Sequence, residues 1–384
     1  MKIAVINPIT RTPTKHIVPQ IDSNKDAMIV KLALEMQALG HEIVLFVSDL
    51  YKPVNEENLD LEVVYLKTYI RGMPEIPFAP SLIGRLRNQY DVVLTSEAFQ
   101  WTTVFAVLAR LLSWKRKPKI YVWQELSVHQ RVLRRLPSIF FHRIILRFFL
   151  DWQIFRYVPR GMRAKHFLNQ QGIKNNRFIS CIPHGVDQRV FFHQTSTPPR
   201  KYILSPARLV ADKGIDTLLR AFRVTRDEGI DVDLIIQGDG PDLALYENMA
   251  REMEIDKFVY FNRARVNHAG MRKLYSEAVF TVIASRRDFM LFSIMESLAC
   301  ETPVIVSDAV DISEEIAEYG GGLVFTCDDY VMLAKQMIDF LIDQSAATEI
   351  KKRVIQAASR YKNNNIAREF INEFKKNSFA RNKK

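Results

Sequence analysis

The sequence predicts an α/β fold in which two doubly wound domains follow one another along the chain. Short runs of β-branched residues alternate with longer segments of helical period, and the alternation starts again after residue 200. A chain of 384 residues, 48% of them hydrophobic, is long enough to form two separate cores. A polar stretch with adjacent prolines, 193–200, has neither period and marks the boundary between the halves.

The first half is expected to contain a parallel sheet covered by helices. Ser23 before the apolar positions Ile29, Leu32 and Met36, with Gly40 after them, predicts an N-cap, a buried helix face and a terminator. The expected strands are 3–6, 43–47, 63–66, 92–95, 120–123 and 178–182.

The second half repeats this organisation and then becomes helical. From Tyr330 onward the periodicity predicts helices, followed by a basic tail. We therefore expect one domain at 1–195, a second at 196–362, and a C-terminal helix with its tail at 363–384. The expected strands are 202–204, 234–237, 259–261, 280–284 and 304–306.

The cysteines and the apolar runs indicate a cytoplasmic protein. Cys181, Cys300 and Cys327 are widely spaced, odd in number and form no CxxC pair, which argues against a disulfide framework and against a zinc site. No apolar run has the roughly 18 to 20 residues of a membrane-spanning helix, and the first residues resemble a strand rather than a signal peptide.

The positive charge is concentrated in one segment. Thirteen Lys or Arg and two acids lie in 115–165, and their difference equals the whole net charge of +11. Within this segment, Arg131 to Arg156 interleaves arginines with Phe, Ile and Trp at helical spacing. One interpretation is a helix lying at an anionic membrane surface, on the inner face of the membrane. The alternative is an ordinary helix with one face in the core. Nucleic-acid binding is not expected, since no recognisable module accompanies these residues.

A strand followed by two cations and a helix is the first indication of chemistry. The strand ends near Ser205, Arg208 and Lys213 follow it, and Gly214 precedes a helix. Cations before a helix N-terminus form a place where a diphosphate can be neutralised, although the same residues suit an exposed, solvated loop.

Four motifs in this order resemble glycosyltransferase family 4, whose members have the GT-B fold of two facing Rossmann-like domains with the cleft between them. They are Pro183-His184-Gly185-Val186-Asp187, Arg208 with Lys213-Gly214, Gly238-Asp239-Gly240-Pro241, and the run 285–306. Each is weak alone, but their order over about 120 residues is a fairly specific signal.

The resemblance implies a donor site in the second domain. Arg208 and Lys213 match the family's pyrophosphate-binding cations, and such cations stabilise the leaving nucleoside diphosphate without a metal or further cofactor. Gly238 and Gly240 match a turn that brings backbone near the nucleotide, or they form a plain strand-to-helix turn. Glu296 matches the second acid of the family's glutamate pair and is expected to bind the ribose hydroxyls.

The chain departs from the family around the first acid of that pair. Asp288 stands where the family has a glutamate, and we expect it to take the catalytic role of that acid. The next residues, 289–291, lack the family's Gly-aromatic-Gly turn, so side chains are expected to occupy space near the donor sugar. Arg286 and Arg287 are additional cations beside the site and are counted among the donor-binding candidates, against the alternative of exposed arginines.

The first domain, which the resemblance assigns to the acceptor, departs further. It lacks the family's glycine-rich loop after the first strand and the histidine that often follows the strand at 120–122. Glu97 and Glu125 lie at the carboxyl ends of two predicted strands, where ligands of open α/β sheets gather. Either acid can orient an acceptor hydroxyl, and the alternative for each is a helix cap or a surface acid.

The resemblance thus implies a retaining glycosyltransferase that moves a sugar from a UDP- or GDP-sugar to a glycan or lipid-linked acceptor in cell-envelope or polysaccharide biosynthesis. Two other functions stay open. The lost glycines and Asp288 also suit a non-catalytic GT-B protein that binds a sugar nucleotide or a partner, and the same fold serves sugar-nucleotide epimerases.

Overall fold

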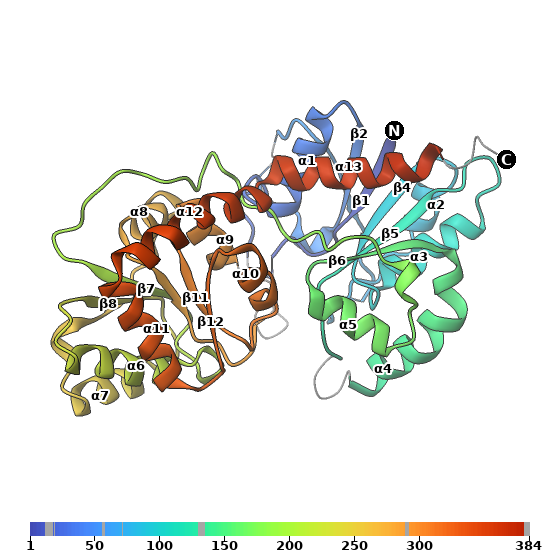
Figure 1. Cartoon of the computed structure of the whole chain (residues 1–384). Helices are drawn as coiled ribbons and strands as arrows, with labels where there is room; N and C mark the ends of the chain where they lie inside the picture. Colours follow the sequence, from blue (N-terminus) through green and yellow to red (C-terminus); the bar gives the residue numbers. More distant parts are fainter. Residues whose placement is uncertain are drawn as a thin grey trace. The chain divides into compact units, whose positions relative to one another are not determined.

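The computed structural model describes residues 1–11, 18, 20–55, 58–70, 72–129, 135–288 and 292–379. The chain divides into two compact units (Figure 1): unit 1 is Met1–Gly185 with Asn363–Lys384, and unit 2 is Val186–Lys362. The chain thus changes unit between Gly185 and Val186, before the polar stretch at 193–200 where the sequence places the boundary.

Unit 1 is built on a parallel six-stranded sheet of order β3-β2-β1-β4-β5-β6. Because this order reverses direction between β1 and β4, the carboxyl ends of those strands flank a topological switch point. The strands are β1 (Lys2–Ile6), β2 (Glu42–Ser48), β3 (Glu62–Leu66), β4 (Val92–Ser96), β5 (Lys119–Gln124) and β6 (Ile154–Pro159).

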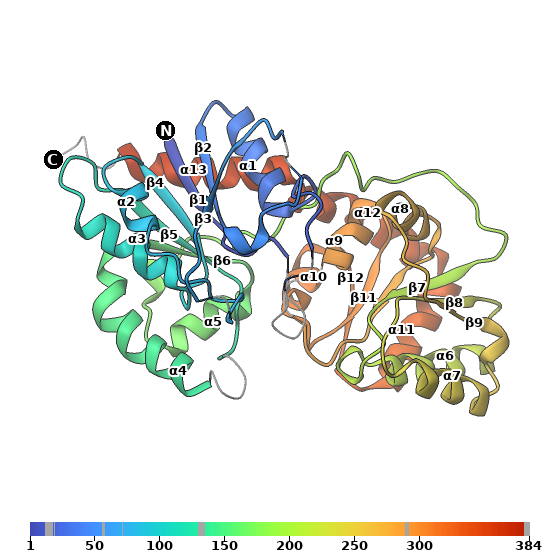
Figure 2. The same ribbon diagram turned by 180° about the vertical axis from the view of Figure 1, so that it is seen from behind.

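Helices cover both faces of this sheet (Figure 2). The α-helices are α1 (Met28–Ala38), α2 (Leu82–Leu86), α3 (Trp101–Leu111), α4 (Arg135–Phe140), α5 (Met162–Gln170) and α13 (Asn363–Phe379). A π-helix, η3 (Phe141–Leu150), continues α4, and the 3-10 turns are η1 (Asp49–Tyr51), η4 (Asp151–Gln153) and η5 (Asn175–Arg177).

Unit 2 repeats the architecture with sheet order β12-β11-β10-β7-β8-β9, so its switch point lies between β7 and β10. Its strands are β7 (Tyr202–Pro206), β8 (Asp233–Gln237), β9 (Val259–Asn262), β10 (Thr281–Ile283), β11 (Val304–Ser307) and β12 (Gly322–Phe325). Its helices are η6 (Ala211–Lys213), α6 (Ile215–Asp227), α7 (Leu243–Glu252), η7 (Asp256–Phe258), α8 (His268–Glu277), α9 (Phe292–Ala299), α10 (Ser313–Tyr319), α11 (Tyr330–Ile342) and α12 (Gln344–Arg360).

The last helix returns to the first unit. Helix α13 lies beside α1 (Figures 1 and 2), and its Ile366, Phe370 and Phe374 are fully buried with residues of β1, β2 and β4. Apolar side chains at this helical spacing complete one side of the core, so the C-terminal segment belongs structurally to unit 1.

Three sequence expectations were wrong in detail. Residues 178–182 form no strand, because they meet β6 only through an isolated bridge at Phe178 and single hydrogen bonds. The sixth strand is instead β6, which was not predicted because its residues continue the basic, aromatic pattern of the segment before it. Strand β12 was not predicted either. Helix α1 begins at Met28 rather than after Ser23, whose hydroxyl accepts a hydrogen bond from the Lys25 N–H in the preceding turn.

Candidate functional site

Loops at the switch point of unit 2 bring together several of the predicted donor residues. Strand β7 leads into the loop 207–214, and strand β10 leads into 284–288. Gly214 has φ 62°, and a Cβ there would lie 2.1 Å from the carbonyl oxygen of Ala284. Glycine is therefore required both for the backbone conformation and for the contact between the two loops.

Two predicted glycines shape the same loop from its other side. Gly238 has φ 152°, and a Cβ on it would lie 2.1 Å from the carbonyl oxygen of Ala207; a Cβ on Gly240 would lie 2.3 Å from that of Leu209. The Leu209 N–H also donates to the carbonyl oxygen of Asp239 at 3.0 Å. These glycines let the turn after β8 pack directly on the loop that carries Arg208.

The two predicted phosphate cations differ in their surroundings. Arg208 is exposed, and within the described residues its guanidinium has no hydrogen-bond or ion-pair partner. Lys213 is 13% exposed, and its ammonium forms a close ion pair with the carboxylate of Asp288, which is 17% exposed. The pair joins the loop after β7 to the loop after β10, so the predicted Lys213 and Asp288 do meet at one place.

Asp288 is also held through its backbone. It forms an isolated bridge with Val310, and the Asp311 N–H donates to its carbonyl oxygen at 3.1 Å. The following residues, 289–291, lie outside the described part of the chain, so the expectation about the missing glycine turn is not addressed by the structure.

Arg286 is engaged with two acids of its own unit. Its guanidinium pairs with Asp216 at 2.7 Å and with Asp328 at 2.8 Å, and it donates to the carbonyl oxygen of Ala211 at 2.6 Å. The hydrogen bond with Asp216 is the main cause that raises the pKa of Arg286. Arg286 thus ties the loop after β10 to the start of α6, and its neighbour Arg287 is partly exposed.

Glu296 lies in the second turn of α9 and is largely buried. The hydroxyl of Tyr275, on α8, donates to its Oε2 at 3.0 Å. Burial raises the pKa of Glu296 to about 6, against a smaller lowering by the Tyr275 hydrogen bond. A carboxylate held by one neutral donor keeps lone pairs for further hydroxyl donors, as ribose recognition requires.

Unit 1 brings the two predicted acids together at the carboxyl edge of its sheet. Glu97 follows β4 and has φ 57°, a strained conformation for a residue with a side chain. Its carboxylate accepts the Glu125 N–H at 2.8 Å, the Leu126 N–H at 3.2 Å and the Gln124 amide at 2.7 Å. Glu97 therefore fixes the start of the loop after β5.

Glu125, whose side chain is about a third exposed, belongs to a charge cluster with buried Arg160 and His184 that the sequence did not predict. Arg160, directly after β6, contacts the carboxylate of Glu125 closely and stacks 4.1 Å above the ring of Trp123. His184 Nε2 lies 3.6 Å from the same carboxylate. In the sequence, Arg160 was only one of the basic residues of 115–165, and His184 only a member of the motif 183–187. The available signal was that Arg160 directly follows β6.

The two acids ionise differently. Burial raises the pKa of Glu97 to about 7. Burial opposes ionisation of Glu125 as well, but the charge of Arg160, with His184 nearby, lowers its pKa to about 2. Burial, and then the charge of Arg160, lower the pKa of His184 to about 4, so that the imidazole is neutral at pH 7. This edge thus holds one permanent carboxylate and one acid that titrates near neutrality.

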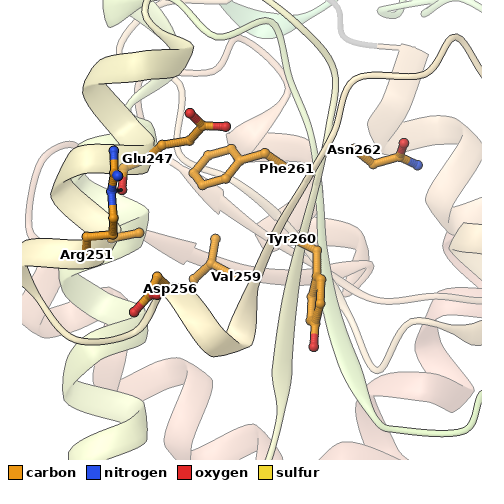
Figure 3. A pocket seen from close by; sticks show the side chains of 8 residues that line it. Glu247, Arg251, Asp256, Val259, Tyr260, Phe261 and Asn262 are labelled. Carbon is orange, nitrogen blue, oxygen red and sulfur yellow. Dashed lines mark hydrogen bonds between the residues drawn. The ribbon is translucent and has the colours of Figure 1, made fainter.

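The hollow drawn in Figure 3 lies elsewhere in unit 2. It measures about 530 Å³ and is lined by residues of α7, η7 and β9, among them Glu247, Arg251 and Tyr260. Since β9 is an edge strand, separated from β7 by β8, this hollow is not formed by the loops at the switch point.

Comparison with known sequences finds a family model that matches most of unit 2. Residues 187–360 match the model described as Glycosyl transferases group 1. A GDP-mannose-dependent alpha-(1-6)-phosphatidylinositol dimannoside mannosyltransferase of Mycobacterium tuberculosis is 32% identical over 149 residues, 36% of this chain and 38% of that protein. An alpha-monoglucosyldiacylglycerol synthase of Streptococcus pneumoniae is 33% identical over 154 residues, 39% of this chain and 32% of that protein. The matches thus span less than half the length of these relatives.

Solved structures establish the fold over nearly the whole chain. Sucrose-phosphate synthase of Thermosynechococcus elongatus superposes with a TM-score of 0.71 and 17% identity, covering 99% of both chains. Anabaena HepE, solved in complex with UDP, gives a TM-score of 0.69 and 14% identity, covering 98% of this chain and all of that one. The predicted GT-B fold is therefore confirmed.

Proposed function

We propose that this chain is a group 1 glycosyl transferase of family 4 that transfers a sugar from a nucleoside-diphosphate sugar to a hydroxyl of an acceptor, with retention of anomeric configuration. The observation that carries the proposal is the switch point of unit 2. Arg208 is exposed and has no partner within the described residues. Lys213 and the partly buried Glu296 come after it along the chain, in the order of the family's motifs.

The proposed donor diphosphate lies against the loop after β7. Breaking the bond between the sugar C1 and the phosphate oxygen leaves the electron pair, and hence negative charge, on the nucleoside diphosphate. Arg208 is exposed and supplies a fork of donors to that charge. Lys213 supplies a second cation once its ammonium turns from Asp288 toward phosphate. Neither step requires a metal ion.

Glu296 is the proposed ribose ligand. When ionised, its carboxylate accepts hydrogen bonds from the two vicinal hydroxyls, while the Tyr275 hydroxyl keeps it oriented. Gly238 and Gly240 support the site indirectly, because they allow the turn after β8 to pack against the loop that carries Arg208. Arg286, held by two acids, has the supporting role of joining the loop after β10 to α6.

We assign the acceptor to unit 1, at the edge where Glu97 and Glu125 meet. Glu125 stays ionised beside Arg160, so it can orient an acceptor hydroxyl by accepting its hydrogen bond. Glu97 titrates near neutrality and can exchange a proton in the same region. In the retaining route that the family resemblance implies, the leaving phosphate itself helps to deprotonate the attacking hydroxyl.

A glycan or lipid-linked acceptor in envelope or polysaccharide biosynthesis is the proposed substrate class. It is supported by relatives whose names specify a phosphatidylinositol dimannoside and a monoglucosyldiacylglycerol product. None of the three cysteines, all of which lie in the described part of the chain, forms a disulfide, which suits a reducing, cytoplasmic site of action for an enzyme using UDP- or GDP-sugars.

A ligand panel followed by product analysis tests the proposal. UDP-, GDP- and ADP-sugars are each added in thermal-shift measurements, and the most stabilising donor is incubated with candidate acceptors. We expect one nucleotide class to raise the melting temperature, and Arg208→Ala to abolish that rise while Arg220→Ala, on the exposed face of α6, leaves it unchanged. Isomerised donor without transfer would identify an epimerase, and binding without any turnover a non-catalytic protein.

A further inference from the structure

An unusual number of large apolar side chains is exposed along α4, η3 and η4. Leu136 is 78% exposed, and the others are between 40% and 66% exposed. Residues of this kind are normally buried in a protein that has no partner at that surface. They are Phe140, Ile144, Phe148, Phe149 and Trp152.

The same helix also has a core-facing side, so the exposure is not a failure to pack. Phe141, Leu146 and Leu150 are buried in the core of unit 1, where Phe141 meets Phe99 edge to face. In the wide turns of the π-helix, buried and exposed positions each recur about every four residues. The interpretation of this segment as an ordinary core helix therefore explains its buried side but not its exposed side.

The end of α3 adds a second apolar segment to this surface. The guanidinium of Arg110 donates to Gln153, in η4, at 3.1 Å, which fixes the end of α3 beside Trp152. Leu111, Leu112 and Trp114 at this end are 45%, 51% and 65% exposed. We call the exposed side chains of α4, η3, η4 and the end of α3 the aromatic face.

The charges around the aromatic face are almost all positive. Arg135, Arg143 and Arg147 are exposed between its apolar residues, and Lys115 and Lys117 are exposed just after α3. The two acids of the segment 115–165 are both neutralised: Glu125 by Arg160, and Asp151 by Arg177.

We infer that the aromatic face docks on an anionic lipid bilayer, with its apolar side chains at the level of the acyl chains and its arginines among the headgroups. Interleaved aromatics and cations, with both acids of the segment paired to arginines, match a negative lipid surface in both polarity and charge. The indole N–H of Trp152 already donates to the carbonyl oxygen of Phe149 at 2.9 Å, so the ring enters an apolar layer without leaving a donor unsatisfied.

The lengths and compositions of the helices agree with docking at the membrane surface, in the plane of the interface. None of those in the described residues is long and apolar enough to cross a membrane. Binding to a bilayer is independent of the proposed transfer reaction, because adsorption to lipid requires neither the sugar donor nor the acceptor. It would keep the acceptor edge of unit 1 near substrates that are themselves embedded in a bilayer.

Vesicle flotation of the full chain tests the inference. Vesicles of phosphatidylcholine alone are compared with vesicles containing phosphatidylglycerol, at low and high salt. The wild type is expected to float with the anionic vesicles and to be released as salt rises. Replacing Phe149 and Trp152 with alanine should weaken binding at least about tenfold. Replacing Arg135, Arg143 and Arg147 with glutamine should weaken it roughly a hundredfold at low salt.

Matched controls separate this surface from general effects. Lys351→Gln, Lys352→Gln and Arg353→Gln together remove the same charge from an exposed side of α12 and should leave flotation unchanged. Tyr260→Ala removes an aromatic ring that is 50% exposed in unit 2 and should also have no effect. The thermal shift caused by nucleotide is expected to persist in every variant, so loss of flotation and loss of the donor site remain distinguishable.

Three outcomes would overturn the inference. They are equal binding to neutral and anionic vesicles, no binding to either, or flotation that the aromatic and arginine variants do not reduce. The protein could instead form a concentration-dependent dimer that the Phe149 and Trp152 variant abolishes, without binding vesicles. That result would mean that the aromatic face binds a second copy of the chain.

Discussion

The carboxyl edges of the two sheets share a topology but differ in charge. In unit 2 the loops at the switch point present Arg208 and Lys213, two cations suited to a diphosphate. In unit 1 the corresponding edge presents Glu97 and Glu125, two acids suited to a hydroxyl. The same arrangement of strands therefore supports different chemistry, because the residues that follow each strand, and not the sheet, decide what the edge binds.

Comparing the partly buried acids of the two edges shows what controls their ionisation. Glu97 and Glu296 have raised pKa values of about 7 and about 6 because burial dominates; the charge of Arg160 lowers the pKa of Glu97 only in part, and within the described residues neither acid forms an ion pair. Glu125 has a lowered pKa of about 2 because Arg160 does contact it. Contact with a guanidinium thus outweighs burial in unit 1, and the following experiments test each side of this comparison.

The largest effect is expected from Arg160→Met, which removes the cation and leaves Glu125 with only His184. Losing the buried arginine of this ion pair, whose acid is about a third exposed, should lower the free energy of unfolding by about 3 kcal/mol at pH 7.5, measured by urea denaturation. Because the folded pKa of Glu125 lies below its unfolded value, the pair stabilises above about pH 4.5 and this contribution is lost as pH falls toward 2. Adding Glu125→Gln should restore most of the loss, and a loss below about 1 kcal/mol would contradict a strong ion pair between Arg160 and Glu125.

The next effect concerns the cations of unit 2. Lys213→Ala should weaken binding of the cognate nucleoside diphosphate at least about tenfold, or about 1.5 to 3 kcal/mol, because a charge-assisted contact to phosphate is removed. Isothermal titration calorimetry measures the change, with Arg220→Ala as the matched variant on α6. Wild-type affinity of Lys213→Ala, together with a stable fold, would remove Lys213 from the donor site.

Glu296→Gln should change stability and binding in opposite directions. The folded pKa of Glu296 is raised, so the ionised carboxylate destabilises the fold as pH rises through about 6, whereas below about pH 4.5 the protonated acid causes no such loss. The variant should therefore be about 1 kcal/mol more stable at pH 7.5, with little difference at pH 4.5, and should bind nucleotide more weakly. Thermal melts at both pH values and calorimetry at pH 7.5 decide this, and unchanged nucleotide affinity would argue against a ribose contact.

The smallest effect is expected from Asp288→Asn. Asp288 competes with phosphate for the ammonium of Lys213, so the neutral variant should bind the nucleoside diphosphate about threefold more tightly while turnover falls. Steady-state kinetics and calorimetry separate the two changes. Weaker binding, similar to that of Lys213→Ala, would mean that Asp288 positions the lysine for the ligand instead of competing with it.

The sequence pattern predicted most strands of the two sheets but not all of them. Alternating β-branched and helical segments predicted two parallel sheets, because burial on both faces imposes that composition. The same rule missed β6, since Phe155, Arg156 and Tyr157 continue the aromatic, basic pattern of the preceding helix. It also proposed a strand at 178–182, where apolar residues lie beside β6 without forming a regular ladder.

The sequence by itself determined the GT-B fold, the order of the donor motifs and the concentration of positive charge, because periodicity and short motifs are local properties of the chain. The tertiary structure decided which charges meet. Lys213 contacts Asp288 across 75 residues, and Arg160 contacts Glu125 across 35, through loops that different strands bring to one edge. It also decided that one side of η3 faces solvent. A helical spacing gives two faces, and only the packing of neighbouring elements selects which of them is buried.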